Sequence, residues 1–444
     1  MVANIVVRAL EELESQTVSP STIEKAAGLL RGGMEQGFGA PIVESIQQAR
    51  LALAVEYAYE RSAFYRERFH KERLIPENVE TPEGLLRLPF TTSDELRDWR
   101  SFLCVPEEEL AGVFTTSGTT GEPKQLYFTY SELQMLTNFS ALALLVRHET
   151  RLKVLVALPM RHGLWIGSGT APQIVRQAGG IPYPVGAGAP EETLVWMRRF
   201  DCNTVMSSPS YMTALTQQAQ AEGYQQHLEN ILVGGEMLTE ERISLFHDYW
   251  GATVFNSYGL TEIGGAQSIS LPTCKGFYVN DLHLYTEIID PDTGSPADEG
   301  ELVFTTLTRK AMPLLRYRSG DRARWLECEQ ELPFRAFEIL GRLDDMLIVG
   351  GVHLYATVVA DAITDAVGGE PRVRIVIDRE ASIDLVTLLI GTDEAEPNTV
   401  RQAFFSAYPE AEDAVNVGRL NLEVKTGIDL GGQIKQLGVE DRRF

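Results

Sequence analysis

Short apolar runs alternate with helix-like segments through the middle of this chain, and this alternation constrains the fold more than any other feature. The runs begin at Val154, Thr204, Ile231 and Thr253, and a Pro, Ser, Gly or Asn follows each of them. Continuous apolar runs bounded by turn residues are typical of strands that a parallel sheet buries on both faces. The sequence therefore predicts an α/β fold built around such a sheet.

The segments before and after this region carry different patterns. Up to about Asp98, apolar residues recur at spacings that favour amphipathic helices, and Pro89 breaks one of these helices. Beyond Gly276, strand-like runs are joined by turn residues such as the Asp-Pro-Asp-Thr-Gly string that starts at Asp290. This chemistry predicts a small antiparallel β unit appended to the sheet.

The C-terminal part of the chain has a mixed pattern of its own. Strands are predicted at Val373–Ile377 and Leu385–Ile390, and a helix is predicted near Val400–Ala407. A mixed set of elements after a change of pattern favours a separate α+β unit. We therefore predict a large N-terminal domain over 1–342 and a small C-terminal lid over 343–444.

Charge and composition exclude several classes of partner. The 444 residues carry a formal net charge of -23 at pH 7, which would repel nucleic acid and anionic membranes. No apolar stretch approaches the roughly 20 residues of a membrane span. The N-terminus also lacks the pattern of a signal peptide, so a cytoplasmic location is predicted. The sequence leaves a homodimer open.

The four cysteines are widely scattered along the chain, at Cys104, Cys202, Cys274 and Cys328. None of them forms a CxxC pair of the kind typical of zinc or redox chemistry. We therefore interpret all four as free thiols with mostly structural roles.

A string of small and hydroxylated residues, FTTSGTTGEPK, runs from Phe114 to Lys124. Its backbone N–H groups and hydroxyls would suit a bound phosphate, although the GxxxxGK[ST] spacing of a Walker loop is absent. The structural alternative is a flexible surface turn. The candidate phosphate contacts are Thr116, Ser117, Gly118, Thr119, Thr120, Gly121 and Lys124.

This string resembles the phosphate-binding loop of adenylate-forming enzymes, and three further segments resemble motifs of that superfamily in the same order. Asn256–Glu262 resembles the motif whose aromatic residue, here Tyr258, stacks near adenine, whose Thr contacts the α-phosphate and whose Glu helps to hold Mg²⁺. Tyr317–Asp321 resembles the motif whose Asp binds both ribose hydroxyls, and Gly341–Asp345 resembles the hinge to a lid. Each segment alone has an ordinary structural interpretation, but four in series indicate function.

Among adenylate-forming enzymes, the chain is most similar to the phenylacetate–coenzyme A ligases, from about Gln47 onward. The strings that start at Ala63, Leu88 and Ser208 carry this similarity. The resemblance implies a large two-part α/β domain with a small antiparallel β unit, and a small α+β lid that swings between two half-reactions. It also implies an enzyme that uses ATP and Mg²⁺ to adenylate an aromatic or arylacyl acid and passes the acyl group to coenzyme A.

The resemblance assigns roles to individual residues. Thr261, Glu262 and Lys435 are the implied catalytic residues, Glu262 is also the implied metal ligand, and Asp344 is the implied hinge. Beyond the phosphate loop, the implied nucleotide contacts are Gly235, Glu236, Asn256, Ser257, Tyr258, Gly259, Asp321 and Arg342. The implied substrate contacts are Arg161, His162, Trp165, Gly167, Ser208, Tyr211, Gly234, Ile263 and Gly264.

Several positions depart from the family pattern. Lys435 is displaced by two positions from the Gly-Lys pair that relatives carry, and the segment Val349–His353 lacks their basic residue. Some relatives bind zinc through Cys and His, but Cys328 stands alone here, so no zinc is expected. The basic residues between Arg309 and Arg324 either supply positive potential near the phosphates or form a solvated face.

These departures keep two alternatives open. In the first, the acyl group goes to the thiol of an acyl carrier protein or to an amine in place of coenzyme A. In the second, the chain is a degenerate nucleotide-binding homologue without ligase turnover. Trp165 and Tyr211 would suit a flat aromatic acid, whereas Arg161 would pair with a second carboxylate.

Overall fold

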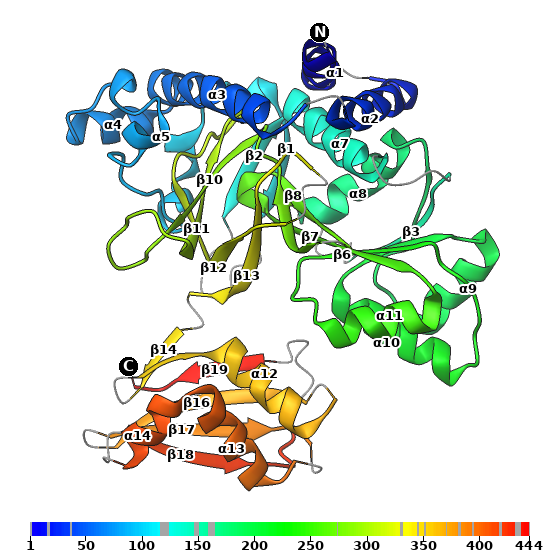
Figure 1. Ribbon diagram of the computed structural model, residues 1–444, viewed down its shortest axis with the longest axis vertical. Helices are drawn as coiled ribbons and strands as arrows, with labels where there is room; N and C mark the ends of the chain where they lie inside the picture. The colour runs from blue at the N-terminus through cyan, green and yellow to red at the C-terminus, as the bar shows by residue number, and fades with distance from the viewer. Residues whose placement is uncertain are drawn as a thin grey trace. The chain divides into compact units, whose positions relative to one another are not determined.

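A computed structural model shows the chain folded into two compact units (Figure 1). One unit comprises residues 1–319 with 324–338, and the other comprises 320–323 with 339–444. The structure describes residues 2–15, 18–35, 38–115, 124–145, 151–158, 165–272, 274–328, 332–343, 346–349, 352–369, 371–380, 383–392, 395–416, 420–430 and 437–443.

Among the described residues, eleven strands form one sheet in the order β10-β11-β12-β13-β9-β8-β7-β6-β5-β3-β4. The half from β4 to β7 is parallel, because β3 pairs in parallel with β4 and β5, β5 with β6, and β6 with β7. Its strands are β3 (Lys153–Ala157), β4 (Ile181–Pro184), β5 (Thr204–Ser207), β6 (Asn230–Gly234) and β7 (Thr253–Leu260). Strands thus lie at all four apolar runs, and the α/β prediction is confirmed.

Helices alternate with these parallel strands along the chain. They are α8 (Ile166–Gln177), α9 (Pro190–Phe200), α10 (Pro209–Ala221) and α11 (Glu240–Trp250). Local chemistry sets their ends: the Ser208 hydroxyl caps α10 by accepting a hydrogen bond from the Tyr211 N–H, and α11 ends at Gly251 with φ of 68°.

The other half of the sheet contains the antiparallel strands that the sequence predicts. They are β8 (Gly265–Leu271), β9 (Cys274–Val279), β10 (Leu284–Ile289), β11 (Glu299–Thr306), β12 (Tyr317–Leu326) and β13 (Ala336–Arg342). In the turn after β10, the Asp290 carboxylate accepts hydrogen bonds from the N–H groups of Asp292 and Thr293. These two hydrogen bonds hold the pKa of Asp290 below its usual value, and the bond from Thr293 has the larger effect. The antiparallel strands continue the parallel half in one sheet.

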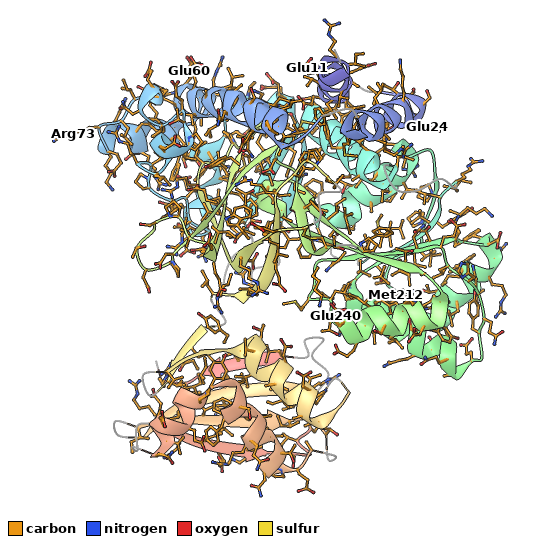
Figure 2. All side chains as sticks on the ribbon, in the orientation of Figure 1. Glu11, Glu24, Glu60, Arg73, Met212 and Glu240 are labelled. Carbon is orange, nitrogen blue, oxygen red and sulfur yellow. A yellow bond between two sulfur atoms is a disulfide. The ribbon has the colours of Figure 1, made fainter. Side chains whose placement is uncertain are left out.

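Helices dominate the chain before this sheet, as the apolar spacing predicts. The long ones are α1 (Val2–Ser15), α2 (Pro20–Glu35), α3 (Ala40–Arg61), α4 (Ala63–Lys71) and α7 (Tyr130–Leu145). The apolar faces of α1 and α2 pack against α7, and Leu10 and Ile23 share a buried cluster with Phe139. Glu11 and Glu24 lie on the exposed faces (Figure 2). No helix in the described part of the chain is long and apolar enough to cross a membrane.

Short elements connect α4 to α7. They are η1 (Pro76–Asn78), α5 (Pro82–Leu85), η2 (Glu95–Arg97), α6 (Trp99–Phe102), η3 (Glu107–Glu109), β1 (Leu110–Thr115) and β2 (Gln125–Thr129). Strands β1 and β2 pair antiparallel and flank the predicted phosphate loop in the sequence. Residues 116–123 of that loop lie outside the described residues.

The smaller unit contains a four-stranded sheet of order β18-β17-β16-β19 and its own buried apolar cluster. Its elements are β14 (Met346–Val349), β15 (Val352–Tyr355), α12 (Ala356–Val367), β16 (Val373–Glu380), β17 (Ile383–Ile390), α13 (Pro397–Ala407), α14 (Pro409–Asn416), β18 (Leu420–Lys425) and β19 (Leu437–Asp441). The two strands and the helix predicted for this region lie within β16, β17 and α13, so those predictions are confirmed.

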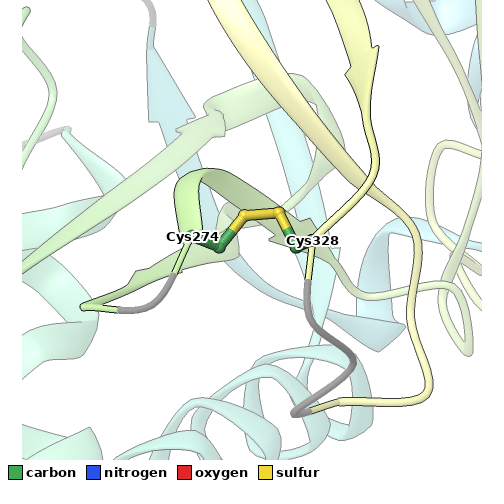
Figure 3. Close-up of a disulfide and its surroundings, with 2 residues drawn as sticks. All are labelled: Cys274 and Cys328. Carbon is green, nitrogen blue, oxygen red and sulfur yellow. A yellow bond between two sulfur atoms is a disulfide. The ribbon is translucent and has the colours of Figure 1, made fainter.

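One prediction about the cysteines is wrong. Cys274 and Cys328 form a disulfide, with Cα atoms 5.5 Å apart, that joins the start of β9 to the segment after β12 (Figure 3). The two residues are 54 positions apart in the sequence, and only the folding of the strands brings them together. Cys104 and Cys202 are free, and burial raises the pKa of each thiol to about 12.

Candidate active site

The turn between β7 and β8 is where the sheet changes from parallel to antiparallel pairing, and it carries Thr261 and Glu262. A short 3-10 helix, η4 (Thr261–Ile263), forms this turn and ends at Gly264, whose φ of 95° favours glycine. At Gly259, a Cβ atom would lie 1.9 Å from the carbonyl oxygen of Gly265, so no larger residue fits. The glycines of the motif therefore set the path of the turn.

Glu262 is the buried centre of a small hydrogen-bonded cluster. Its Oε1 accepts a hydrogen bond from the Tyr317 hydroxyl at 2.9 Å and forms an ion pair with the Lys124 ammonium. Lys124 also donates to the Ser93 hydroxyl at 2.8 Å. The fold thus brings Lys124, which ends the phosphate-loop string, onto a carboxylate 138 positions away. Within the described part of the chain, Lys124 is the cation that pairs with the Glu262 carboxylate.

A second, fully buried ion pair lies beneath this turn. The Arg309 Nε donates to Glu132 Oε1 at 2.8 Å, and Arg309 Nη1 donates to the carbonyl oxygen of Glu262 at 3.2 Å. Glu132 Oε1 also accepts from the backbone N–H of Lys310 at 2.8 Å. Burial lowers the pKa of Arg309, and the adjacent Glu132 opposes that shift. Sequence reasoning missed Glu132, because nothing local in α7 marks it.

The basic residues between Arg309 and Arg324 are largely neutralised by acidic partners. Besides the Arg309 pair, Arg316 pairs with Glu287, Arg318 with Glu301 and Arg324 with Glu338. The Arg316 and Glu287 side chains are 3% and 6% exposed. This pair is therefore buried and does not belong to a solvated face. These contacts therefore favour neither of the two interpretations drawn from the sequence for the whole stretch.

An apolar cavity of about 290 Å³ opens onto this turn within the larger unit. Among the described residues, those that line it include no Asp, Glu, Lys, Arg or His. Many residues that the family resemblance implies as substrate or nucleotide contacts line it: Trp165, Gly167, Gly234, Gly235, Asn256, Ser257, Gly259, Thr261 and Gly264. Segments far apart in the sequence thus converge on one space whose described lining carries no charged side chain.

Other predicted contacts have partners away from the cavity lining. The Tyr211 hydroxyl lies 2.7 Å from that of Thr193, and the exposed Glu236 accepts hydrogen bonds from the backbone N–H and hydroxyl of Ser210. Tyr258 packs in a ring cluster with Phe277, Phe304 and Phe337. Ile263 is buried in η4, and Ser208 caps α10. Their roles in ligand binding stay predictions.

The predicted ribose-binding carboxylate lies in the smaller unit with an arginine partner. Asp321 is 6% exposed, and its Oδ1 accepts a hydrogen bond from Arg342 Nη1 at 3.1 Å. Both residues belong to the set implied to contact the nucleotide. Arg161, His162, Asp344 and Lys435 lie outside the described residues, together with the phosphate-loop positions up to Gly121.

Comparison with known proteins decides which family this site belongs to. Residues 44–307 match the family described as AMP-binding enzyme. The chain belongs to this AMP-binding enzyme family. Within it, a phenylacetate–coenzyme A ligase from Thermus thermophilus is 32% identical over 366 residues, which cover 79% of this chain and 82% of that protein. A phenylacetate–coenzyme A ligase from Aromatoleum evansii is 29% identical over 88% of this chain and 89% of its own.

Solved structures support the same fold for this AMP-binding enzyme. A 2-hydroxyisobutyryl-CoA ligase in the postadenylation state matches with a TM-score of 0.72 at 20% identity, covering 91% of this chain and 90% of that one. At this level of identity the match concerns the fold alone. The phenylacetate–coenzyme A ligase resemblance of the sequence and the α/β architecture are thereby confirmed.

Proposed function

We propose that this AMP-binding enzyme is an ATP-dependent acid–thiol ligase that adenylates an aryl-containing carboxylic acid and transfers the acyl group to coenzyme A. The observation that carries the proposal is the apolar cavity that Thr261 lines, next to Glu262 in η4, and whose described lining carries no charged side chain. Such a cavity holds an apolar tail, while the polar turn receives the reacting carboxylate and the phosphates.

The proposed reaction has two balanced steps. First, a carboxylate oxygen of the acid attacks the α-phosphorus of ATP, a P–O bond forms, and the bond to the leaving pyrophosphate breaks. Second, the thiol sulfur attacks the acyl carbon and loses its proton, a C–S bond forms, and AMP leaves with the electrons of the C–O bond. The first step brings an anion onto a highly charged anion, so positioning and charge neutralisation are the main requirements.

The residues of the turn suit those requirements. Thr261 would contact the α-phosphate, and its place beside Glu262 in η4 aligns the two groups on one backbone turn. The Glu262 carboxylate is a hard oxygen ligand at a buried position, which fits Mg²⁺ that takes one or two protein carboxylates with phosphate oxygens. When bound, Mg²⁺ would neutralise phosphate charge. Lys124, which now pairs with Glu262, would then be free to contact a phosphate oxygen.

The lining of the cavity favours one class of acid over others. A second carboxylate or an ammonium group on the substrate would need a buried partner, and the described lining residues provide none. Trp165, Phe255 and Phe334 instead offer aromatic surface. We therefore propose a substrate whose tail is uncharged where it contacts these described residues; a second carboxylate would need Arg161, which lies outside them.

The smaller unit would serve as the lid for both steps. In this proposal, Asp321 binds the ribose, Arg342 orients it through their hydrogen bond, and Asp344 acts as the hinge. Lys435 would support adenylation and would be exchanged for other groups during thiol transfer. Because Val349–His353 lacks the basic residue of relatives, the thiol of an acyl carrier protein remains the alternative acceptor.

The test is pyrophosphate release by the purified protein with ATP and Mg²⁺, across aromatic, aliphatic, dicarboxylic and amino acids, each with and without coenzyme A. We expect release with aryl-containing monocarboxylic acids, formation of the coenzyme A thioester, and no release by a Glu262→Ala variant. Acyl-adenylate that accumulates despite coenzyme A would favour the carrier-protein alternative. ATP binding without pyrophosphate release from any acid would overturn the ligase proposal.

A further inference from the structure

Very different parts of the chain line the apolar cavity. Thr261 and Gly264 come from the turn between β7 and β8, and we call this part of the lining the reaction end; Leu10 and Leu30 come from helices α1 and α2, and we call their part the far end. Both leucines are buried, at 3% and 4% exposure. The N-terminal helices therefore form part of the cavity wall in addition to covering the sheet.

Helices α1 and α2 lie outside the segment that matches the AMP-binding enzyme family, which begins at residue 44. They are nevertheless held in a defined position by polar contacts. Glu14 pairs with Arg50 of α3 at 2.7 Å, Asn138 of α7 donates to the carbonyl oxygen of Leu13 at 2.9 Å, and Arg31 donates to that of Leu145 at 2.7 Å. Because these three contacts fix the position of the two helices, the wall that the helices form can select among ligands by shape.

The size of the cavity exceeds what a single aromatic ring requires. An apolar cavity of about 150 Å³ is sufficient to bind benzene. The cavity here measures about 290 Å³, close to twice that volume, and aromatic and aliphatic side chains, Trp165 and Leu30 among them, line it. An acid with one ring next to its carboxylate would leave much of this apolar wall without contact.

We infer that helices α1 and α2 form the specificity wall of the acyl pocket, and that the substrate is a monocarboxylic acid whose uncharged tail extends beyond one ring to Leu10 and Leu30. This inference rests on the proposed ligase function and names its substrate class. Each methylene of the tail that reaches the wall adds about fourfold to affinity, from about 0.8 kcal/mol per buried CH₂. The two leucines contact the substrate tail and determine specificity; they take no part in the chemistry.

The test is a chain-length series of phenylacetate, 4-phenylbutyrate, 6-phenylhexanoate and 8-phenyloctanoate. We expect kcat/KM for pyrophosphate release to rise by about 15-fold at each of the first steps, because each step adds two methylenes, and to level off when the tail fills the cavity. In Leu30→Phe the optimum moves to a shorter acid, because the added ring occupies the end of the cavity. In Leu10→Ala the optimum moves to a longer acid.

Leu13→Ala is the matched control. Leu13 lies on the same helix and in the same buried cluster as Leu10, at 0% exposure, but does not line the cavity. It should lower stability as Leu10→Ala does and leave the length profile unchanged. A profile that peaks at phenylacetate in the wild type, or that Leu30→Phe and Leu13→Ala alter alike, would overturn the inference.

A binding measurement separates this inference from the ligase proposal. Affinities of the same acids for the wild type and for Leu30→Phe are measured by calorimetry without ATP. If no acid releases pyrophosphate while affinity still rises with length and Leu30→Phe removes that rise, the wall is supported and the ligase proposal fails. If pyrophosphate is released but neither affinity nor kcat/KM depends on length, the ligase proposal stands and the wall is refuted.

Discussion

The two ends of the apolar cavity differ in chemistry and in origin. At the reaction end, Thr261 and Glu262 lie on a turn that close-packed glycines shape and that paired charges support. At the far end, Leu10 and Leu30 contribute apolar surface from helices outside the family match. A backbone turn tied to buried charges tolerates little change, whereas an apolar wall adjusts through single side chains. In our proposal, separate parts of the chain therefore carry chemistry and specificity.

The largest effect is expected at the ion pair beneath the reaction end. Glu132→Gln leaves the Arg309 guanidinium buried without its counter-ion, which should lower the free energy of unfolding by about 3–5 kcal/mol. Chemical denaturation measures the loss. The control is Glu338→Gln, because its partner Arg324 is half exposed and such pairs contribute at most about 1 kcal/mol. Equal losses in both variants would show that burial of the pair does not explain its importance.

Next comes the carboxylate that we assign to the reaction itself. Glu262→Gln removes the charge but keeps the size, and we expect pyrophosphate release to slow by about 10²–10³-fold, as for loss of one transition-state contact. Tyr317→Phe removes one hydrogen bond to Glu262 and should slow it by about 10-fold or less. The rates come from initial-velocity measurements at saturating ATP and acid. A Glu262→Gln variant as fast as wild type would remove Glu262 from the mechanism.

The disulfide tests the far end of the cavity. Cys274 lies with Leu332 in a small buried cluster, and the partly buried Cys328 and Met34 of α2 pack against it. Since the bond closes a loop spanning 54 positions, reduction should lower the free energy of unfolding by about 2–4 kcal/mol. Unfolding is measured with and without dithiothreitol. The double variant C274S/C328S should not respond to the reductant, and a wild type that does not respond either would mean that the thiols are free.

The smallest effect is a pH dependence, also near the far end. His283 is buried beside Phe139, and its Nε2 lies 3.7 Å from the Glu14 carboxylate. Burial, and to a smaller extent the positive charge of Arg50, hold the pKa of His283 well below its usual value. The unfolded chain therefore binds a proton at His283 where the native one does not. The stability that this group contributes is complete above about pH 6.5 and falls below it, by at most about 1.4 kcal/mol per pH unit.

The raised pKa of Glu14 acts in the opposite direction, because the native carboxyl binds its proton at higher pH than the unfolded one. His283→Gln isolates the histidine contribution, and we expect its unfolding free energy to fall less steeply with acid than that of the wild type. Denaturation midpoints across pH 4.5–7.5, with the interval chosen around the ordinary His value of about 6.5, measure the difference. Parallel profiles would show that His283 takes up a proton without cost.

Local sequence patterns predicted most of the fold and part of the candidate site. The apolar runs at Thr204 and Ile231 became parallel strands, and the string at Asp290 became a hydrogen-bonded turn. These predictions hold because backbone preference and burial pattern act over a few neighbouring residues. The motif from Asn256 to Glu262 was predicted to be functional through its resemblance to adenylate-forming enzymes, and its turn became visible only in the structure.

Other features depend on contacts between distant segments. The sequence by itself placed Thr261 and Glu262 in one motif and predicted Lys124 as part of a phosphate loop. Only the tertiary structure paired Lys124 with Glu262, joined Cys274 to Cys328, and brought Leu10 to the apolar cavity. Strand order and helix packing decide such contacts, and neither is encoded in the periodicity of a single segment. The sequence alone therefore predicted the residues of the proposed reaction end, whereas only the fold determined which residues line the far end.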